Sequence, residues 1–228
     1  MIEVTQIRKS YGKKKVLSDI TFQIKPGECV AIAGKNGCGK STLMQIMAGT
    51  LKADAGKLCY FGENISYRSS AFHRLCGYVP QENPLLEELT VQDNLKLWGG
   101  SGNAYMKELI RQFQLEDLLK TEVRKLSGGM KRRLSIASAL VENPPFVLMD
   151  EPTTALDLSY KESIHQWMKT YQQKKGIILI TTHDESEIRN ASRCLFMEEG
   201  KVQELDAYSI LQKFASKSGE TAGQKKHL

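Results

Sequence analysis

Residues 34–41, with the sequence GKNGCGKS, match the phosphate-binding loop pattern G-x-x-x-x-G-K-[ST]. The octet follows an apolar run at 29–33 and precedes a segment with Leu43, Ile46 and Met47 on one side, so the pattern predicts a strand, a loop and a helix in succession. Glycines let the backbone N–H groups of such a loop point inward at a polyphosphate, and the positive end of the helix dipole faces the same charge. We therefore expect a nucleotide phosphate site; a flexible glycine-rich turn is the alternative.

Side chains in and just after this loop have separate expected roles. The Lys40 ammonium group is expected to neutralise the β and γ phosphates, and the Ser41 hydroxyl is expected to hold Mg²⁺. The expected nucleotide contacts are Gly34, Lys35, Asn36, Gly37, Cys38, Gly39, Lys40, Ser41 and Thr42.

The cysteine pattern favours a reducing compartment. The five cysteines include no C-x-x-C pair, and Cys38 lies inside the loop, where a disulfide would obstruct the ligand. The amino terminus has no basic segment followed by an apolar one, and no apolar run reaches the length that crosses a bilayer. We therefore expect a cytosolic chain that is neither secreted nor membrane-spanning on its own.

The net charge of +6 does not by itself indicate nucleic-acid binding, because half of it comes from the tail after residue 212. A second basic cluster, 13–15, follows a glycine in an expected turn. No stripe of Lys and Arg alternates with aromatic residues along one helix, which a nucleic-acid surface would favour. A mildly basic surface is the preferred interpretation, and a face near anionic lipid is the second one.

Apolar patterning predicts β structure first and helices later. Ile20, Phe22 and Ile24 alternate with polar residues, and 57–62 resembles another strand. From 82 to about 141 the pattern is helical, which predicts an inserted helical subdomain.

Strand character returns in the second half of the chain, at 146–149 and at 177–182. Short apolar runs separated by helices indicate buried parallel strands joined by crossovers. Residues 194–204 predict a closing hairpin that turns at 199–200. The main domain is expected to span residues 1–215, and the polar, lysine-rich tail at 216–228 is expected to be disordered.

Two acidic residues follow the apolar run at 146–149. Asp150 is placed to reach Mg²⁺ directly or through water, as the last residue of a Walker B strand does. Glu151 is the candidate base, since a carboxylate there can orient and deprotonate a water in line with the γ phosphate. The alternative is that both residues cap a helix starting at 152–153.

A second candidate phosphate site lies at 126–130, with the sequence LSGGM, before an amphipathic helix. Ser127, Gly128 and Gly129 would present backbone N–H groups and a hydroxyl at the helix start. One nucleotide rarely needs two such sites from one chain, so two copies arranged head to tail would use both. An ordinary helix cap remains the alternative.

Together these motifs resemble those of the ATP-binding cassette (ABC) transporter ATPase subunits. The resemblance covers about residues 2–211, and six short motifs in the family's order make a chance match very unlikely. The motifs are the Walker A loop at 34–41, the Q-loop glutamine Gln81, the signature at 126–130, the Walker B residues Asp150 and Glu151, the D-loop at 155–157 and the switch histidine His183.

The resemblance implies roles for residues that the pattern alone leaves open. Gln81 would contact Mg²⁺ and the attacking water and sense a membrane partner, and His183 would bond the γ phosphate beside Glu151. Tyr11 matches the aromatic residue that stacks on adenine, and Asp157 would lie at the seam between two cassettes. Without the resemblance, Gln81 is an ordinary loop residue, His183 a core histidine and Tyr11 a hairpin aromatic.

One residue departs from the family pattern. The fifth signature position, usually Gln, is Met130, and Lys131, Arg132 and Arg133 follow it. This change leaves the backbone N–H donors and Ser127 unaltered, so nucleotide binding between two cassettes should persist. The variant is similar to that of drug and antibiotic exporter cassettes.

The resemblance implies a P-loop NTPase core of the ABC type, which is an α/β fold with a mainly parallel sheet, an antiparallel β subdomain and an inserted helical subdomain. It implies binding and hydrolysis of ATP with Mg²⁺ by a homodimer or a heterodimer with a related cassette. ATP binding and hydrolysis would act on a separate transmembrane permease at the inner face of the cell membrane, and the transport would most simply be export. The alternative is a soluble ABC-type ATPase that is regulatory or associated with nucleic acid or the ribosome. For the preferred transporter role, no nucleic-acid partner is expected.

Overall fold

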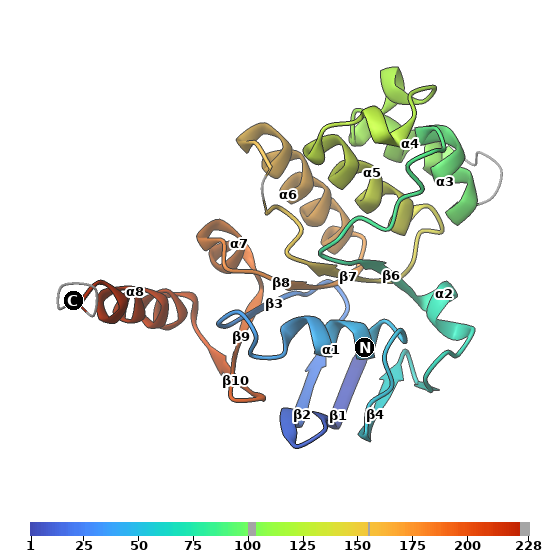
Figure 1. Cartoon of the computed structure of the whole chain (residues 1–228). Helices are drawn as coiled ribbons and strands as arrows, with labels where there is room; N and C mark the ends of the chain where they lie inside the picture. Colours follow the sequence, from blue (N-terminus) through green and yellow to red (C-terminus); the bar gives the residue numbers. More distant parts are fainter. Residues whose placement is uncertain (100–103, 155, 224–228) are drawn as a thin grey trace.

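Two sheets and a group of helices make up the structure, a computed structural model that describes residues 1–99, 104–154 and 156–223 (Figure 1). The first sheet has the strand order β2-β1-β4-β5 and is antiparallel. Its strands are β1 (Ile2–Tyr11), β2 (Lys14–Ile24), β4 (Ala55–Tyr60) and β5 (Glu63–Ile65). Alternation of buried and exposed side chains along β2 follows from one face packing on the core while the other meets solvent.

The second sheet has the order β10-β9-β3-β8-β7-β6 and is parallel except for β10. Its strands are β3 (Cys29–Ala33), β6 (Cys76–Val79), β7 (Phe146–Asp150), β8 (Ile177–Thr181), β9 (Arg193–Glu198) and β10 (Lys201–Leu205). Strands β3, β7 and β8 are buried along their whole length, because helices or the first sheet cover both faces. The strands predicted at 29–33, 146–149 and 177–182 and the closing hairpin are confirmed.

Helices surround this sheet and separate it from the first one. They are α1 (Lys40–Met47), α2 (Ala71–Leu75), α3 (Val91–Gly99), α4 (Ala104–Gln112), α5 (Gly128–Leu140), α6 (Leu158–Gln173), α7 (Glu185–Asn190) and α8 (Ala207–Gly223), with short 3₁₀ turns η1 (Glu116–Leu118) and η2 (Val123–Lys125). Figure 1 shows α1 between the two sheets, while α3, α4, α5 and α6 lie beyond the opposite face of the second sheet.

The core has two parts, one on each face of the second sheet. Val30 and Ile32 of β3 belong to the part shared with α1 and the antiparallel sheet. Ala31 and Ala33 belong to the part shared with α5 and α6. This division follows from the period of two in a strand, which sends successive side chains to opposite faces.

Helices α3, α4 and α5 occupy the segment between β6 and β7, two strands that are direct neighbours in the sheet. The helical segment expected at about 82–141 therefore leaves and re-enters the sheet between adjacent strands. Within α3, Val91 and Leu95 are buried, whereas Leu97 and Trp98 are more than half exposed. No helix in the described part of the chain combines the length and apolar character needed to cross a bilayer.

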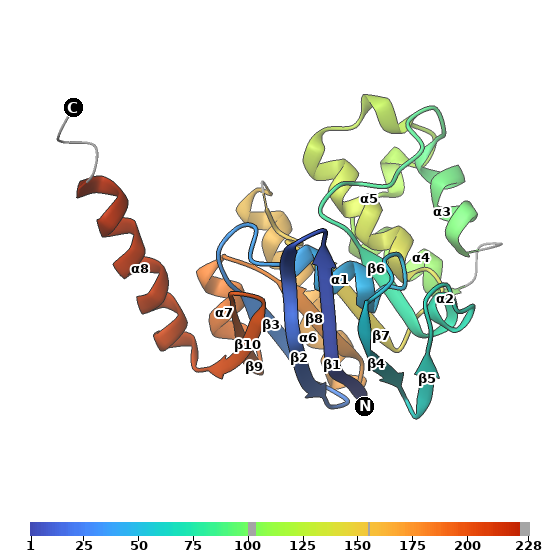
Figure 2. The ribbon, with the colours of Figure 1, turned by 60° about the horizontal axis from the view of Figure 1, so that its bottom comes forward.

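The carboxyl-terminal tail differs from the expected disorder over part of its length. Helix α8 continues to Gly223, so residues 216–223 are helical, and 224–228 lie outside the described residues. Figure 2 shows α8 extending away from both sheets.

Candidate active site

The predicted phosphate loop and the predicted catalytic residues lie at the carboxyl ends of four adjacent parallel strands. The phosphate loop follows β3, His183 lies just beyond β8, Asp150 ends β7, and Gln81 follows β6. These strands are neighbours in the order β3-β8-β7-β6. Ligands of open α/β sheets bind at this edge.

The phosphate loop connects β3 to α1 and wraps around the Lys40 side chain. The Lys40 Nζ donates to the carbonyl oxygens of Gly34 (2.7 Å) and Lys35 (3.2 Å), and the residue is only 6% exposed. Ser41 and Thr42 lie in the first turn of α1. The loop therefore places one ammonium group and the start of a helix at the same point, which suits a polyphosphate.

At two positions the conformation of this loop requires glycine. A Cβ at Gly34 would clash with the Met197 carbonyl oxygen of β9. Gly39 has a φ of 112°, in the left-handed region, and precedes α1. A Cβ there would lie 3.1 Å from the Val16 carbonyl oxygen of β2, so the β1–β2 hairpin packs against the loop.

Tyr11 ends β1 in that same hairpin and is 50% exposed. The Lys9 Nζ lies 5.6 Å from the centroid of its ring. One face of an exposed aromatic ring beside a phosphate loop is available for stacking on a base.

Cys38 of the loop stays a neutral thiol at ordinary pH. Burial raises its pKa above that of a free cysteine, although the nearby Lys40 charge acts in the opposite direction. The neutral thiol adds no negative charge that would repel a phosphate.

Asp150 is buried at the end of β7, directly opposite Thr181 of β8. The Thr181 Oγ1 donates to the Asp150 Oδ1. The bond fixes the orientation of the carboxylate at the sheet edge. With the Ser41 hydroxyl, Asp150 offers the hard oxygen ligands that Mg²⁺ prefers.

The Glu151 carboxylate contacts side chains from two other segments of the chain and one from its own segment. The Gln81 Nε2 lies 3.5 Å from its Oε2, the His183 Nδ1 lies 3.5 Å from its Oε1, and the Thr154 Oγ1 donates to Oε2 at 3.2 Å. The Glu151 side chain is 11% exposed, whereas that of His183 is 59% exposed. The structure thus brings together a recessed carboxylate, an imidazole that faces solvent and an amide.

The backbone of Glu151 is strained. Its φ is +49°, a conformation that costs a non-glycine residue on the order of 1 kcal/mol. Its N–H is held by the Thr181 carbonyl oxygen (3.1 Å) and Oγ1 (3.0 Å). This geometry also excludes the alternative in which Asp150 and Glu151 cap a helix at 152–153, since α6 begins only at Leu158.

The glycine-rich turn at 126–130 forms the amino-terminal end of α5. Ser127 is the N-cap, and its Oγ accepts a hydrogen bond from the Met130 N–H at 3.3 Å. Ser127 and Gly128 are exposed. The hydroxyl thus caps its own helix, while the start of the helix faces solvent rather than the rest of the chain.

The D-loop residue Asp157 occupies the N-cap position of α6 and is exposed; its side chain makes no capping bond. Its neighbour Leu156 is buried against the core, and Ala155 lies outside the described residues. Leu156 therefore anchors the segment while Asp157 points to solvent.

Asp184, next to His183, is a supporting residue that the sequence did not single out. It caps α7 through the Ser186 N–H (2.8 Å) and pairs with the Lys161 Nζ (2.7 Å) of α6. Burial disfavours its charge, yet the bonds from Lys161 and Ser186 hold its pKa well below the ordinary range. The pattern of Asp followed by an acidic first turn is a helix-start signal that could have identified it.

We expect Asp184→Asn to lower the free energy of unfolding by about 1–2 kcal/mol at pH 7, because a charge-assisted cap and ion pair are lost. The depressed pKa makes this contribution complete above the ordinary Asp value and removes it as pH falls through the folded-state pKa. Urea unfolding should therefore separate the variant from the parent at neutral pH, and the difference should shrink only as pH falls from the ordinary Asp value of about 4 toward the folded-state pKa. Asp117→Asn, at an exposed position, is the control, and an equal loss there would contradict the assignment.

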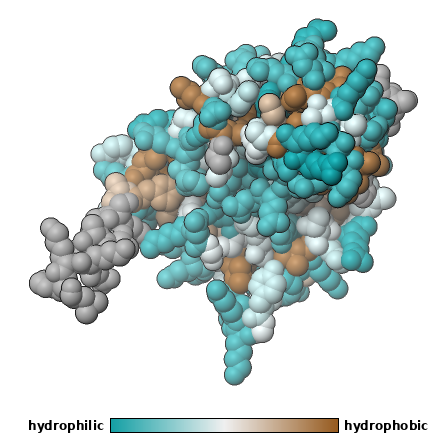
Figure 3. All heavy atoms as spheres, turned by 45° about the horizontal axis from the view of Figure 1, so that its top comes forward, coloured by the Kyte–Doolittle hydropathy of each residue, from teal (hydrophilic) through white to brown (hydrophobic). Residues whose placement is uncertain are grey.

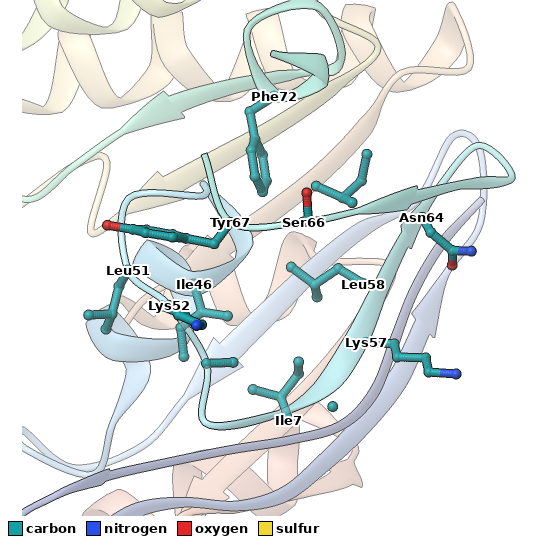
Figure 4. Close-up of a pocket in the computed structure, with 13 residues that line it drawn as sticks. Ile7, Ile46, Leu51, Lys52, Lys57, Leu58, Asn64, Ser66, Tyr67 and Phe72 are labelled. Carbon is teal, nitrogen blue, oxygen red and sulfur yellow. The ribbon is translucent and has the colours of Figure 1, made fainter. Parts of the chain in front are cut away.

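A cavity of about 440 Å³ lies elsewhere, between the antiparallel sheet, the end of α1 and α2 (Figure 4). Ile7, Leu58 and Phe72 contribute to its wall. None of the predicted nucleotide-site residues lines it. This cavity is therefore separate from the predicted nucleotide site at the sheet edge.

Comparison with known proteins agrees with this geometry. The family model described as ABC transporter matches residues 17–154. The chain is 37% identical over 209 residues to Nod factor export ATP-binding protein I of Paraburkholderia xenovorans, covering 88% of this chain and 68% of that protein. The protein of the same name from Bradyrhizobium diazoefficiens is 36% identical, with coverages of 87% and 68%.

Solved structures of cassettes share the fold. A dimeric ATP-binding cassette in a post-hydrolysis state, bound to ADP and Pi, has a TM-score of 0.82 and 28% identity, covering 91% of this chain and 99% of that one. A structure described as the ATP-binding subunit of an ABC transporter has a TM-score of 0.83 and 28% identity, with coverages of 94% and 93%. The phosphate loop, the carboxylates at the sheet edge and these likenesses lead to one conclusion: the chain belongs to the ABC transporter family, as an ATP-hydrolysing cassette that drives transport.

Proposed function

We propose that Glu151 is the general base for ATP hydrolysis and that Gln81 and His183 position the attacking water. The observation that carries this proposal is the convergence of both side chains on one carboxylate, each at 3.5 Å. In this arrangement Glu151 accepts the proton of the water as it attacks the γ phosphate. His183, whose side chain is more exposed than that of Glu151, donates a hydrogen bond to the phosphate.

The remaining site residues bind the nucleotide. Lys40 and the loop N–H groups hold the β and γ phosphates, and Tyr11 stacks on adenine. Ser41, Asp150 and Gln81 offer the oxygen ligands for Mg²⁺, which would supply charge neutralisation at the phosphates when bound. Support comes from the placement of the phosphate loop, Asp150 and Gln81 at one edge of the second sheet, while Tyr11 lies in the hairpin of the first sheet that packs against the loop.

Two cassettes close around two ATP molecules in this proposal. Ser127, Gly128 and Gly129 of one copy would complete the phosphate site of the other, and Asp157 would lie at the seam. The exposure of Ser127, Gly128 and Asp157 supports this, as does the dimeric state described for a similar cassette. Contacts made only in the closed dimer favour closure with ATP, and loss of the γ phosphate removes them.

Closing and opening of the cassette dimer act on a separate transmembrane permease, and the cassette lies at the cytoplasmic face of the membrane. Export is the favoured direction, because the similar Nod factor proteins are named for it. Co-purification of the chain with a permease from detergent-solubilised membranes tests this partnership, and recovery of the chain without one would contradict it.

The loop after Gln81 is the proposed docking surface for the permease. Its Leu86 is 52% exposed, while the buried Asn94 of α3 bonds the Leu86 N–H (2.9 Å) and carbonyl oxygen (3.0 Å). The backbone is thus fixed and the side chain stays free to contact a partner. Figure 3 shows apolar patches between hydrophilic side chains on the face that carries the helices. Leu85 and Leu89 flank this position.

A variant with Leu85→Ser and Leu86→Ser is expected to lose transport while keeping its basal ATP hydrolysis, because apolar contact with the permease is removed far from the phosphate chemistry. Burial of one leucine is worth about 1.5–3 kcal/mol, so the affinity for the permease should fall at least tenfold. Vesicle transport and phosphate release measure the two activities. Tyr208→Ser, which removes an exposed apolar group from α8, is the control. Unchanged coupling in the double variant would contradict this docking site.

A further inference from the structure

Arg132 of α5 is buried and binds five backbone carbonyl oxygens. It is 5% exposed. Its Nη2 donates to Asp150 (2.7 Å) and Glu151 (3.0 Å), its Nε to Pro152 (3.1 Å), and its Nη1 to Pro80 and Gln81 (3.4 Å). A guanidinium group has five N–H donors in a rigid fork, so all of its donors face these carbonyls.

The five carbonyls belong to the two segments that carry the proposed catalytic side chains. Pro80 and Gln81 follow β6, whereas Asp150, Glu151 and Pro152 end β7. One planar group thus joins them. Within the described residues the guanidinium bonds backbone carbonyl oxygens and no carboxylate oxygen, so its hydrogen bonds restrain backbone positions rather than neutralise a single acid.

The charge of Arg132 is costly at this position. Burial lowers its pKa, although the negative charges of Asp150, Glu187 and Glu151 oppose the change. A buried polar cluster of this kind is retained where it specifies geometry, since an apolar residue would serve packing alone.

Glu151 is the residue whose geometry most needs such support. Its strained backbone is held at the N–H by Thr181 and at the carbonyl by Arg132. The Gln81 side chain approaches the Glu151 carboxylate while its own carbonyl accepts from the same guanidinium. A change in the position of Arg132 would therefore move both proposed catalytic groups.

Arg132 also lies one turn into the helix that begins at the exposed Ser127 turn. Because a helix moves as a rigid element, a shift at its amino-terminal end is carried to the guanidinium group. We propose that Arg132 is a positioning residue that couples the signature helix to the catalytic geometry of Glu151 and Gln81. The proposal rests on the proposed role of Glu151 as the base.

The neighbouring Arg133 provides a matched control. It is equally buried, at 3% exposed, and donates to the carbonyl oxygens of Phe113 (2.9 Å) and Gln114 (3.2 Å). Its guanidinium carbon lies 4.1 Å from the centroid of the Tyr160 ring. These contacts support α5 without reaching the segments after β6 or at the end of β7.

The test compares Arg132→Lys with Arg133→Lys in the full chain, using radiolabelled ATP. Lysine keeps the charge but is a point donor that cannot span both segments. For Arg132→Lys we expect kcat to fall about 10–100-fold with KM for ATP changed less than about threefold, because geometry of the chemical step is lost and binding is kept. For Arg133→Lys we expect a lower melting temperature with kcat within about threefold of the parent.

A double-mutant cycle tests whether Arg132 acts through Gln81. Adding Arg132→Lys to Gln81→Ala should lower kcat by less than it does in the parent, because one of the two catalytic groups that Arg132 positions is already absent. A folded Arg132→Lys protein with the parent's kcat, or an equal kcat loss in Arg133→Lys, would overturn the inference. Glu151→Gln is measured in parallel. If Glu151→Gln abolishes turnover while Arg132→Lys leaves kcat unchanged, the base assignment stands and the proposal for Arg132 fails. If Glu151→Gln has no effect, the assignment of the base itself fails.

Discussion

Glu151→Gln is expected to reduce kcat for ATP hydrolysis by roughly 10²–10⁴-fold, the range attributed to a positioned general base. Glutamine has nearly the same shape, so the contacts with Gln81 and Thr154 can persist while proton acceptance is lost. ATP affinity should stay close to that of the parent, since the change affects the chemical step. Release of radiolabelled phosphate measures the rate, and equilibrium binding measures the affinity.

Glu162→Gln is the matched control for this experiment, because Glu162 is exposed on α6 and has no place in the site. A rate that Glu151→Gln leaves untouched would disprove the assignment of the base.

The Glu151→Gln variant should accumulate as a closed dimer with saturating MgATP, because the contacts that favour closure are no longer removed by hydrolysis. Sedimentation velocity with and without nucleotide measures the change. A variant that stays monomeric with MgATP, and has no related cassette to join, would contradict the shared seam.

Lys40→Met is expected to weaken ATP binding by about 100-fold and to abolish measurable turnover. The substitution removes a buried ammonium group, and charge-assisted bonds to phosphate are worth about 1.5–3 kcal/mol. Methionine keeps the length and apolar part of the side chain, so the loop should still close over it. Calorimetric titration with MgATP measures affinity, and circular dichroism checks the fold.

Lys107→Met removes one positive charge from an exposed position on α4 and is the control for a general effect of net charge. ATP binding by Lys40→Met equal to that of the parent would show that the phosphates lie elsewhere.

The central strands could be predicted from the sequence because their signal is local. The runs at 29–33 and 146–149 are fully apolar, and burial on both faces of a parallel sheet requires this pattern in every residue. The phosphate loop is also local, since glycine spacing and one lysine specify its conformation. Gln81 and His183, by contrast, depended on resemblance, because single polar residues in loops carry little signal of their own.

Arg132 could not be recognised from the sequence. It lies among basic residues after the glycine-rich turn, and such a cluster ordinarily faces solvent. Only the packing of α5 against the ends of β6 and β7 shows that this arginine is buried and its neighbour Lys131 is bound at the surface to Glu87. The left-handed backbone conformation of Glu151 could not be predicted from the sequence either, since nothing in its local sequence favours it.

The sequence alone determined the phosphate loop, the buried strands and the order of the motifs, because each depends on residues within a few positions of one another. The tertiary structure decided which groups meet. It placed Gln81, Glu151 and His183 within 3.5 Å contacts and joined two strand ends through Arg132. The physical reason is that these contacts connect segments far apart in the chain, and their geometry follows from strand order and helix packing rather than from local pattern.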